Sequence, residues 1–517
     1  MSKAVGIDLG TLNSCIGIWD KSKAIIIPSN FGNYIIPSMV SFDENETLIG
    51  QSAKNKLIKN YMNTITSTKR LIGRQYEDKE VQEDIKNLHY KIEEDEETGN
   101  PIIILDHKKK IEKIFPEYVS SLILNYLKQM SEVFTKSKIE DAVITVPANF
   151  NENQRQSTIE AAENAGLNVL RIINEPTAAA ITYGLQHKEN YKKNILIFDL
   201  GAGTFDVSVL EIKDGIIVVK STCGNSHLGG EDFDNEIKKI CISKFKNENN
   251  IDITNDLRAN VRLKIACEEA KERLTNEFET TIDIINLADN KDFNFKINRV
   301  DFEEYCNKLF NKLMPIVNKA ILDSKLSKNE IDDIVLVGGG SRMPKVRDIL
   351  KKNFGEKKVK ILQNINPDEA VAYGASYLAY LIMEGITDDK VILVDVIGIS
   401  IGMEIYSNKM KIIIPKNTTI PISKKIRVET TYDNQTSLCV NIYQGENVEN
   451  INKNNFLKSI YIDNIAKAKA GEIKFDITFI IDVNSTLNIK VENLDTGEIT
   501  FHDLSNQYNK FDEINYM

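Results

Sequence analysis

The sequence predicts an α/β fold followed by an all-β domain. Strand, helix and strand patterns recur from the N-terminus to about residue 380, and this alternation is typical of α/β architecture. Two strand–Asp-Leu-Gly–strand units lie about 190 residues apart, at Asp8 and Asp199, which indicates two related halves that face each other. After residue 396 the chain changes to short alternating runs separated by turn residues, the pattern of an antiparallel β-sandwich.

Local patterns predict the elements of the first part. Short apolar runs bounded by turn residues predict strands, and apolar residues three and four apart predict helices. Strands are expected at 4–8, 15–19, 142–146, 195–198, 205–212 and 335–337, and helices at 51–75, 116–136 and 151–165. Gly166 follows the last helix, a suitable stop position. The charged stretch 91–110 contains a Thr-Gly-Asn-Pro break and is expected to be an exposed hairpin or loop.

Eight alternating runs predict the strands of the sandwich. They are residues 400–406, 411–415, 425–431, 438–444, 458–462, 473–483, 487–493 and 499–501. Before them, the apolar strip 391–394 is flanked by acids and is too short for a core helix. We interpret it as a linker that docks on the first domain, with an ordinary first strand of the sandwich as the alternative. The expected domains are 1–386, a linker 387–396, a sandwich 397–504 and a short tail 505–517.

Composition excludes several classes of protein. The chain has 517 residues, with 65 Lys and Arg against 75 Asp and Glu and a net charge of −10, so binding to nucleic acid or to an anionic membrane is not expected. Six Cys without a CxxC pair and five His without an HExxH pattern argue against a disulfide scaffold and a zinc site. No apolar run reaches about 18 residues, and no signal or transit pattern is recognisable. We expect a reduced, soluble, cytoplasmic protein.

Two glycine turns are the first candidates for chemistry. Asp8 and Asp199 each stand at a strand end beside such a turn. Glycine lets backbone N–H groups approach phosphate oxygens, and the carboxylate can hold Mg²⁺ through water. Thr11 and Thr204 add hydroxyl donors. A plain hairpin turn would explain one copy, but two copies with matching flanks favour phosphate binding. The chain has no GxxxxGK[ST], so the site is not of the P-loop kind.

A third glycine turn follows the strand expected at 335–337. Gly338, Gly339 and Gly340 permit close backbone approach to a flat ligand such as adenosine, and Arg342 can stack on a base. Alone this signal is weak, since triple glycine also marks ordinary tight packing. Glu175 precedes a rigid proline; as a lone feature it more often belongs to a turn than to a catalytic site.

Eight motifs follow one another along the first domain. They are GIDLGTLNS (6–14), KRLIGR (69–74), ITVPANF (144–150), RIINEPTAAAITYGL (171–185), FDLGAGTFDVSVL (198–210), LGGEDFDN (228–235), VLVGGGSRMPKV (335–346) and NPDEAVAYGA (366–375). Together they resemble the signatures of the 70-kDa heat-shock (DnaK-like) chaperones, whose ATPase domain is of the actin-like and sugar-kinase type. The resemblance continues through VILVDV, PKNTTIPISK (415–424) and TTYDNQTSLCVNIYQGE (430–446). It implies an α/β actin-like two-lobed ATPase domain followed by an all-β peptide-binding sandwich.

The resemblance also implies roles for individual residues of the ATPase domain. Lys69 matches the lysine aimed at the γ-phosphate, where a cation stabilises the charge of phosphoryl transfer. The catalytic and metal-binding carboxylates matched are Asp8, Glu175, Asp199 and Asp206, with Mg²⁺ held by the first three, largely through waters. Contacts to ATP or ADP are implied for Gly10, Thr11, Leu12, Asn13, Lys69, Gly201, Ala202, Gly203, Thr204, Glu268, Lys271, Thr275, Gly338, Gly339, Gly340, Ser341, Arg342 and Asp368. K⁺ is a further ion implied at this site.

Coupling and peptide binding are implied in the same way. Pro147, Arg171 and Asp395 match residues that link the nucleotide state to docking of the linker. Met403, Tyr406, Thr431, Leu438 and Val440 match positions around the peptide groove; the alternative is that they are merely core of the sandwich. The implied partners are unfolded or extended polypeptides, a J-domain co-chaperone and a nucleotide exchange factor, with neither nucleic acid nor membrane.

The departures from the family pattern leave an alternative function open. Leu12 replaces a threonine, and Gly340 replaces a serine. Ala202 replaces a glycine, and the Cβ of this alanine is expected to restrict φ and to crowd the phosphates. The loop AKAKAGE (466–472) lacks the expected prolines, and the helical lid of the family is not expected in this chain. The leading hypothesis is a slow ATPase and ATP-dependent chaperone. The alternative is a lidless scaffold that hydrolyses ATP poorly beside a J-domain partner, for example at the ribosome; a sugar kinase leaves the sandwich unexplained.

Overall fold

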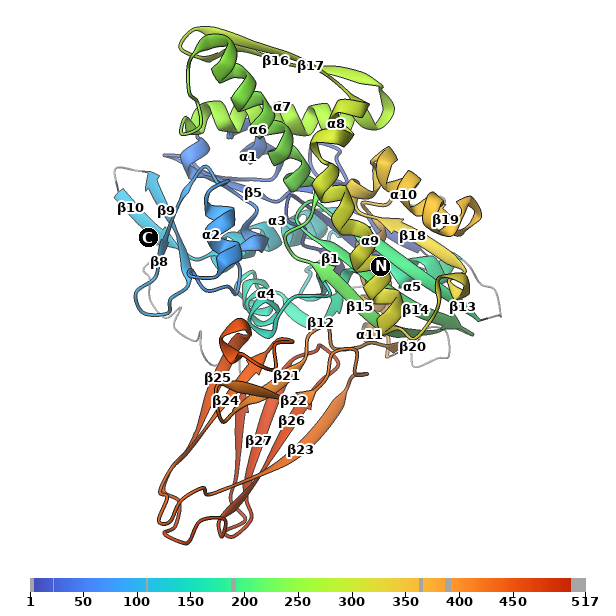
Figure 1. The fold of residues 1–517 in the computed structure, drawn as a ribbon. Helices are drawn as coiled ribbons and strands as arrows, with labels where there is room; N and C mark the ends of the chain where they lie inside the picture. The colour runs from blue at the N-terminus through green and yellow to red at the C-terminus, as the bar shows by residue number, and fades with distance from the viewer. Residues whose placement is uncertain are drawn as a thin grey trace. The chain divides into compact units, whose positions relative to one another are not determined.

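The computed structural model describes residues 4–21, 23–107, 110–186, 192–361, 366–385 and 392–503 (Figure 1). The chain is α/β with several sheets. Contacts divide it into two units, unit 1 with Met1–Asn149 and Ser157–Ile392, and unit 2 with Phe150–Gln156 and Leu393–Met517. The domain boundaries expected from the sequence stay predictions, and those in 386–391 and 504–517 lie outside the described residues.

Unit 1 contains two sheets built to one plan. The first has the order β12-β11-β1-β2-β3 and the second the order β19-β18-β13-β14-β15-β20, in which β20 (Ile392–Val394) comes from the expected apolar strip. In each, the first strand of an Asp-Leu-Gly unit pairs antiparallel with the next strand and parallel with a later one, β1 with β11 and β13 with β18. The bounds are β1 (Ala4–Asp8), β2 (Asn13–Asp20), β3 (Lys23–Ile26), β11 (Asp141–Val146), β12 (Asn168–Asn174), β13 (Lys193–Leu200), β14 (Phe205–Lys213), β15 (Ile216–Asn225), β18 (Asp333–Val337) and β19 (Val359–Ile361). The two halves expected from the repeated motif therefore share one topology.

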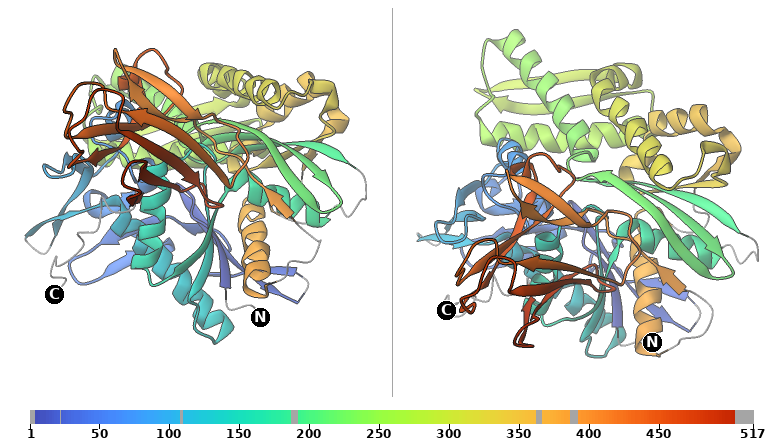
Figure 2. Two further views of the ribbon diagram at one scale, coloured as in Figure 1. Left: turned by 90° about the horizontal axis from the view of Figure 1, so that it is seen from below. Right: turned by 60° about the horizontal axis from the view of Figure 1, so that its bottom comes forward.

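Helices and smaller sheets complete this part of the chain. The helices are α1 (Gln51–Lys56), α2 (Lys79–Ile85), α3 (Pro116–Thr135), α4 (Glu152–Asn164), α5 (Glu175–Gln186), α6 (Gly230–Asn249), α7 (Leu257–Asn276), α8 (Arg299–Tyr305), α9 (Asn307–Asp323), α10 (Pro344–Phe354) and α11 (Ala370–Met383). The further strands are β4 (Ile36–Pro37), β5 (Met39–Phe42), β6 (Thr47–Ile49), β7 (Thr64–Thr66), β8 (Lys91–Glu94), β9 (Pro101–His107), β10 (Lys110–Ile114), β16 (Glu279–Ala288) and β17 (Lys291–Asn298). Helix α7 packs on β16 and beside α6, as Figures 1 and 2 show.

Helix α11 packs closely on the sheet of the first half. A Cβ on Gly6 of β1 would overlap the backbone nitrogen of Ser376 in α11. The strand and the helix can approach this closely only because residue 6 has no side chain. Trp19 of β2 packs on the rings of Tyr377 and Tyr380 with centroids 4.6 and 6.0 Å apart. Close approach and aromatic packing together fix α11 across the sheet that carries the first glycine turn.

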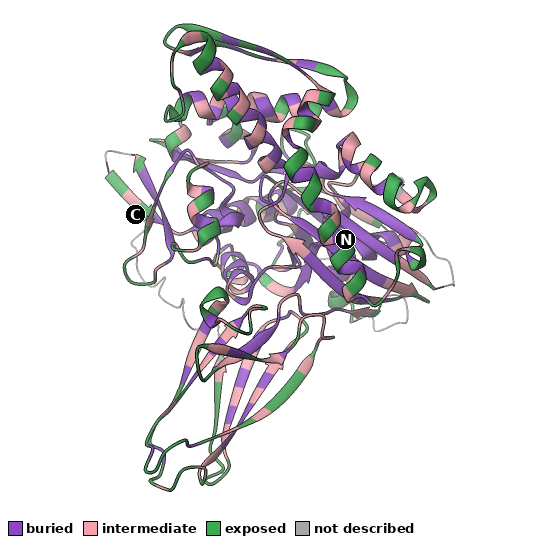
Figure 3. Cartoon of the chain, viewed as in Figure 1, coloured by how far each residue is buried: buried purple, intermediate pink, exposed green. Residues whose placement is uncertain are grey.

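One helix and one loop expected from the sequence differ from the structure. The helix expected at 51–75 is wrong beyond residue 56: α1 is followed by the 3₁₀ turn η1 (Tyr61–Asn63), by β7 and by the 3₁₀ turn η2 (Thr68–Arg70). The β-branched run Thr64-Ile65-Thr66 favours a strand, and Ser67 has a left-handed φ of 58° that a helix does not allow. The stretch 91–110 does form a hairpin, but the residues from Pro101 to Leu105 are buried rather than exposed (Figure 3).

Unit 2 contains two antiparallel four-stranded sheets around one core. Their orders are β22-β21-β24-β25 and β23-β26-β27-β28. The strands are β21 (Ile401–Ile405), β22 (Lys409–Ile414), β23 (Ile422–Glu429), β24 (Leu438–Gln444), β25 (Asn455–Ile462), β26 (Lys474–Ile481), β27 (Leu487–Asn493) and β28 (Ile499–Asp503). Alternate residues of β26 point inward, and Phe475, Ile477, Phe479 and Ile481 are fully buried. All eight strands expected from the alternating runs are present. Among the described helices of the chain, none is long and apolar enough to span a membrane.

Candidate functional site

A cavity of about 770 Å³ in unit 1 brings together segments that lie far apart in the sequence. Its wall includes both Asp-Leu-Gly turns, η2, the start of α5, one face of α7 and the 3₁₀ turn η4 (Gly339–Arg342). The sequence-predicted residues on this wall are Asp8, Gly10, Thr11, Leu12, Asn13, Lys69, Glu175, Asp199, Gly201, Ala202, Thr204, Glu268, Lys271, Thr275, Gly338, Gly339, Gly340, Arg342 and Asp368. One cavity therefore collects most of the predicted site.

Three predicted residues support the wall instead of lining it. Asp206, paired with Asp199 across β13 and β14, is buried and accepts a hydrogen bond of 2.8 Å from Nδ2 of Asn149. Ser341 is buried and donates from Oγ to the carbonyl of Gly338 at 2.7 Å. Gly203 faces the first turn, where a Cβ would meet the side chain of Thr11. We expect these residues to act through their neighbours.

Buried carboxyl groups surround a single lysine at one end of the cavity. Nζ of Lys69 lies 2.5 Å from Oε1 of Glu175, and both side chains are buried. Burial, with the negative charge of Glu175 added, raises the pKa of Asp8 to about 7. Burial also raises the pKa of Asp199 well above its usual range, followed by the charges of Glu175 and Asp206. Lys69 is the positive charge that lowers both of these pKa values, and it does not offset the effect of burial. A bound cation would keep the carboxyl groups ionised.

The donor chemistry of this end fits magnesium held through water. Within the described residues, no three His, Cys, Asp or Glu side chains lie close enough together to hold a metal ion directly. Asp8, Glu175 and Asp199 offer only oxygen atoms to the cavity, the ligand type that Mg²⁺ prefers, and Mg²⁺ usually keeps several of its waters. The three carboxylates therefore fit a hydrated Mg²⁺ better than a directly bound one.

The other end of the cavity is open to a flat ligand between α7 and η4. Glu268, Lys271 and Thr275 share one face of α7 because they are three and four residues apart. Lys271 donates to Asp234 Oδ2 at 2.7 Å. Across from them, Nη2 of Arg342 bonds to Asp368 Oδ2 at 2.6 Å. The guanidinium plane is thereby fixed at the wall, where it can stack on a base.

The unusual residues of the glycine turns fit the structure locally. Ala202 is not among the residues with positive φ, so its Cβ causes no backbone strain, contrary to the expectation from its glycine-like position. Leu12 keeps a turn role, since its carbonyl accepts the N–H of Ser38 at 2.7 Å. A Cβ on Gly340 would lie 2.8 Å from Cγ of Leu200. Glycine at 340 is therefore required by packing in this chain.

Several wall residues escaped the sequence prediction. Gly230, Glu272, Arg347 and Lys351 line the cavity but were not singled out. Glu272 lies four residues after Glu268 on α7, and Arg347 and Lys351 lie four apart on α10. Glu272 could have been predicted from its helical spacing to Glu268, which the sequence had already indicated. Arg347 and Lys351 lie beyond the glycine motif, and no comparable pattern in the sequence points to them.

The predicted peptide-binding residues are spread over unit 2. Met403 and Leu438 are partly buried and pack on its core, while Val440 is 3% exposed and belongs to the core. Tyr406 is 80% exposed, and the backbone N–H of Thr431 donates to Oε1 of Gln435 at 2.7 Å. Met403 and Leu438 are thus available at the sandwich surface, whereas Val440 supports them from inside.

The predicted coupling residues have defined local surroundings. Pro147 ends β11 and is buried, and Arg171 lies on β12. In unit 2, Asp395 is almost buried, and its Oδ1 accepts the N–H of Val396 at 2.8 Å. Within unit 1, the N–H of Ile392, which belongs to the expected linker, donates to the carbonyl of Gly215 at 3.1 Å, directly before the start of β15.

Comparison with known proteins identifies the family. The sequence model described as "Hsp70 protein" matches residues 4–515. The chain belongs to the Hsp70 family. It is 42% identical over 502 residues to "Heat shock 70 kDa protein" of Neurospora crassa, covering 96% of this chain and 77% of that protein. It is 41% identical to "Heat shock cognate 70 kDa protein 3" of Dictyostelium discoideum (96% and 79% covered) and to a "Ribosome-associated molecular chaperone" of Saccharomyces cerevisiae (97% and 82% covered).

Membership in the Hsp70 family confirms the main functional prediction. This Hsp70 is an ATP-dependent molecular chaperone and an ATP hydrolase. Hsp70 proteins bind ATP or ADP with Mg²⁺ and bind unfolded polypeptides and co-chaperones. The family implies ATPase lobes followed by a β-sandwich, in agreement with the α/β sheets and the two antiparallel sheets of this chain.

Proposed function

We propose that the cavity of unit 1 is the ATP site and that hydrolysis occurs at the end where Lys69 and the carboxyl groups meet. The observation that carries this proposal is the convergence of both glycine turns, Lys69, Glu175 and Asp199 on one wall. Backbone N–H groups of the two turns would hold the phosphates. The α7 face and Arg342 would hold the adenosine from opposite sides.

Each group at the phosphate end has a distinct task. The Nζ of Lys69 would neutralise the negative charge that develops on the γ-phosphate. Its 2.5 Å contact with Glu175 sets where the ammonium group points. Asp199 would orient the attacking water and accept its proton, and Thr204 would donate to a phosphate oxygen. Asp206, which lies behind the wall and is paired with Asp199, would act through that neighbour. Mg²⁺, when bound, supplies charge neutralisation of the phosphates, and K⁺ is an expected further counter-ion of the same carboxylates.

The magnesium assignment can be tested apart from turnover. Mg²⁺ added to the ADP complex should raise the thermal midpoint, because a ligand that binds only the folded state stabilises it. Asp199→Asn should reduce that increase. A control variant, Asp252→Asn, alters an exposed carboxylate paired with Lys246 and should leave the increase unchanged. An equal increase in all three proteins would contradict the assignment.

In unit 2, Met403, Leu438 and Tyr406 are proposed to bind an extended apolar polypeptide segment, with Thr431 beside it and Val440 supporting the pocket from the core. Main-chain hydrogen bonds would give affinity, and the apolar pocket would select one side chain. Residues 387–396, of which 387–391 lie outside the described residues, are proposed as the linker that couples the two domains, through Pro147, Arg171 and Asp395. The expected partners are a J-domain co-chaperone and a nucleotide exchange factor, in the cytoplasm, and the likeness to a ribosome-associated chaperone makes nascent chains a reasonable client class.

One experiment tests the whole assignment. Steady-state ATP hydrolysis is measured for the parent chain alone, with a Leu-rich peptide, and with a J-domain protein. Slow basal hydrolysis that both additions accelerate is expected. Tight ATP binding without hydrolysis under any condition would favour the scaffold alternative. A hydrolysis rate that does not change when peptide is added would show that the ATP site and the proposed peptide site are not coupled.

A further inference from the structure

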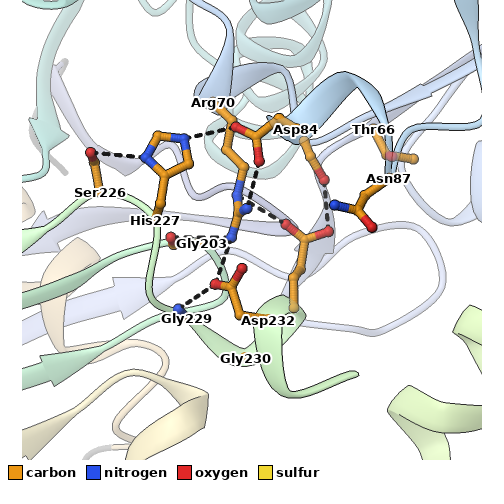
Figure 4. Close-up of polar contacts among 12 residues, drawn as sticks. Thr66, Arg70, Asp84, Asn87, Gly203, Ser226, His227, Gly229, Gly230 and Asp232 are labelled. Carbon is orange, nitrogen blue, oxygen red and sulfur yellow. Dashed lines mark hydrogen bonds and ion pairs between the residues drawn. The ribbon is translucent and has the colours of Figure 1, made fainter. Parts of the chain in front are cut away.

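Arg70, the residue next to Lys69, lies in a buried network on the far side of η2 (Figure 4). Its side chain is 8% exposed. Nη1 donates to Asp84 Oδ1 at 2.9 Å, and Nη2 donates to Asp232 Oδ2 at 3.0 Å and to the carbonyl of Gly203 at 3.3 Å. One guanidinium group therefore binds α2, α6 and the second glycine turn at once.

The elements that Arg70 contacts are themselves joined to the phosphate end of the cavity. The N–H of Gly230 donates to the carbonyl of Gly201 at 2.9 Å, and the N–H of Glu231 donates to the carbonyl of Ala202 at 2.9 Å. The first turn of α6 and the second glycine turn thus form one hydrogen-bonded body. Because Arg70 binds both parts of that body, any shift of η2 relative to the turn must strain these bonds.

A second contact holds the start of η2 on the same helix. Ser67 has a left-handed φ of 58°. Its hydroxyl group donates to Oε1 of Glu231 at 2.9 Å. The same oxygen accepts from Nζ of Lys264 at 2.7 Å. Burial would raise the pKa of Glu231, but the charges of Lys264 and Arg70 outweigh it and lower the pKa to about 2. Glu231 therefore stays ionised, and the segment that carries Lys69 is held at both ends.

One pair of charged atoms in the network is too far apart for a normal hydrogen bond. Nε of Arg70 lies 3.5 Å from Oε2 of Glu231. Both atoms are buried, and neither has a hydrogen-bond partner among the described residues. Buried polar atoms of this kind are costly to leave unpaired. A movement of about half an ångström would bring Nε of Arg70 and Oε2 of Glu231 to a normal hydrogen-bond length. The contact between η2 and α6 can therefore become closer.

We propose that Arg70 is a positioning residue for ATP hydrolysis: it fixes Lys69 and the second glycine turn relative to each other. The inference rests on the proposed role of Lys69. Arg70 does not line the cavity and so would not touch the nucleotide. Arg70 would affect hydrolysis by setting the position of the Lys69 ammonium group, whose charge must lie near the γ-phosphate in the transition state.

The test compares Arg70→Gln with Arg74→Gln, a second buried arginine four residues further along the chain. Arg74 contacts Ser226 at 3.3 Å and Asp78 at 3.8 Å, and within the described part of the chain it has no hydrogen bond or ion pair with the glycine turn or with α6. A misplacement of about 1 Å can lower a rate about 100-fold, so Arg70→Gln should slow single-turnover hydrolysis between about 10- and 100-fold. The dissociation constant for ATP should stay within about threefold. Arg74→Gln should match the parent, and Arg70→Lys, which lacks the fork, should fall between.

A double-mutant cycle with Lys69→Ala distinguishes positioning from general support. If Arg70 acts through Lys69, Arg70→Gln should slow the Lys69→Ala variant by less than about twofold. The same factor in both backgrounds would overturn the inference while leaving Lys69 in its role. Parent-like hydrolysis by Lys69→Ala would instead overturn the assignment of Lys69 and with it the basis of the inference.

A milder variant keeps the test informative if Arg70→Gln does not fold. Asp232→Asn removes one charged acceptor of Arg70, and its side chain is only partly buried. It should slow hydrolysis less than Arg70→Gln, with the same dependence on Lys69. Loss of activity that only follows loss of folded protein, measured by circular dichroism and the thermal midpoint, would overturn the positioning role.

Discussion

A Cβ placed on Gly203 would lie 2.7 Å from Oγ1 and 2.9 Å from Cγ2 of Thr11. The backbone of the second glycine turn therefore packs directly on the side chain of Thr11 in the first turn, where the two halves of the ATPase unit meet. Any Cβ at 203 must displace Thr11, because contacts this short force neighbouring atoms to move.

The first prediction concerns this contact. Gly203→Ala should destabilise the folded unit by about 1–3 kcal/mol, the usual cost of overpacking, and should weaken ATP binding by displacing Thr11. For stability, Gly201→Ala is the matched control in the same turn, since its Cβ would meet only Thr204, with the carbonyl oxygen 3.6 Å away. Urea unfolding compares the two variants, and ATP titration measures the loss of binding in Gly203→Ala. Equal destabilisation of the two variants would contradict the contact.

The second prediction concerns Lys69. Lys69→Ala removes the buried cation that faces Glu175 at 2.5 Å. ATP hydrolysis should fall about 100-fold or more, the usual loss for a preorganised charge in the transition state. ATP binding should largely survive, because the glycine turns and the α7 face are unchanged. A variant that hydrolyses ATP as fast as the parent would show that another group stabilises the γ-phosphate.

The sequence predicted more of the fold than of the site. Alternation predicted the eight described strands β21 to β28 because one face of each sheet is buried, as in β26. The helix expected from apolar spacing failed beyond residue 56, where β-branched residues and the left-handed Ser67 produce a strand and a 3₁₀ turn. Arg70 was missed because its partners, from Asp84 to Asp232, come together only through tertiary packing.

The third prediction concerns stability in acid. His89 is 6% exposed, and its Nε2 contacts the carbonyl of Thr64 at 2.9 Å. Burial lowers the pKa of His89 to about 4 from 6.5. The unfolded chain therefore takes up a proton below pH 6.5 while the folded chain does not, so the free energy of unfolding falls as pH drops from about 6.5 to 4.

At about pH 5.5 this group should cost about 1.4 kcal/mol relative to about pH 7.5, since one pH unit below the unfolded pKa corresponds to about that energy. Urea unfolding of His89→Gln should lack this part of the pH dependence. Tyr90→Phe removes the neighbouring hydrogen bond from the Tyr90 hydroxyl to the carbonyl of Thr66 and should keep the parent's pH dependence. The same slope in all three proteins would assign the dependence to other groups.

The fourth prediction concerns the linker. The N–H of Ile392 already bonds to the carbonyl of Gly215 in unit 1, so the proposed docking would extend an existing contact. ATP should suppress proteolytic cutting within residues 392–396, and ADP should restore it. Lys69→Ala, which should bind ATP without hydrolysing it, should keep the protected state for longer. Equal cutting with both nucleotides would remove the proposed coupling.

The last prediction concerns Leu438 at the proposed peptide site. Leu438 and Cys439 are neighbours on β24 and therefore point to opposite faces of the sheet. Leu438 packs partly on the core, whereas Cys439 is exposed. Leu438→Asp places a charge in the apolar pocket and should weaken binding of a fluorescent Leu-rich peptide about 10-fold or more, a loss of roughly 1.4 kcal/mol or more. Most of that loss should be in the dissociation rate.

Cys439→Asp is the matched control, because it adds the same charge one residue away on the other face. It should bind and release peptide at the parent's rates in both ATP and ADP. Circular dichroism must show that both variants keep the sandwich, since Leu438 also contributes to its packing. Equal weakening by the two aspartates would mean that net charge, not the pocket at Leu438, governs binding. Peptide binding unchanged in Leu438→Asp would place the groove elsewhere on unit 2.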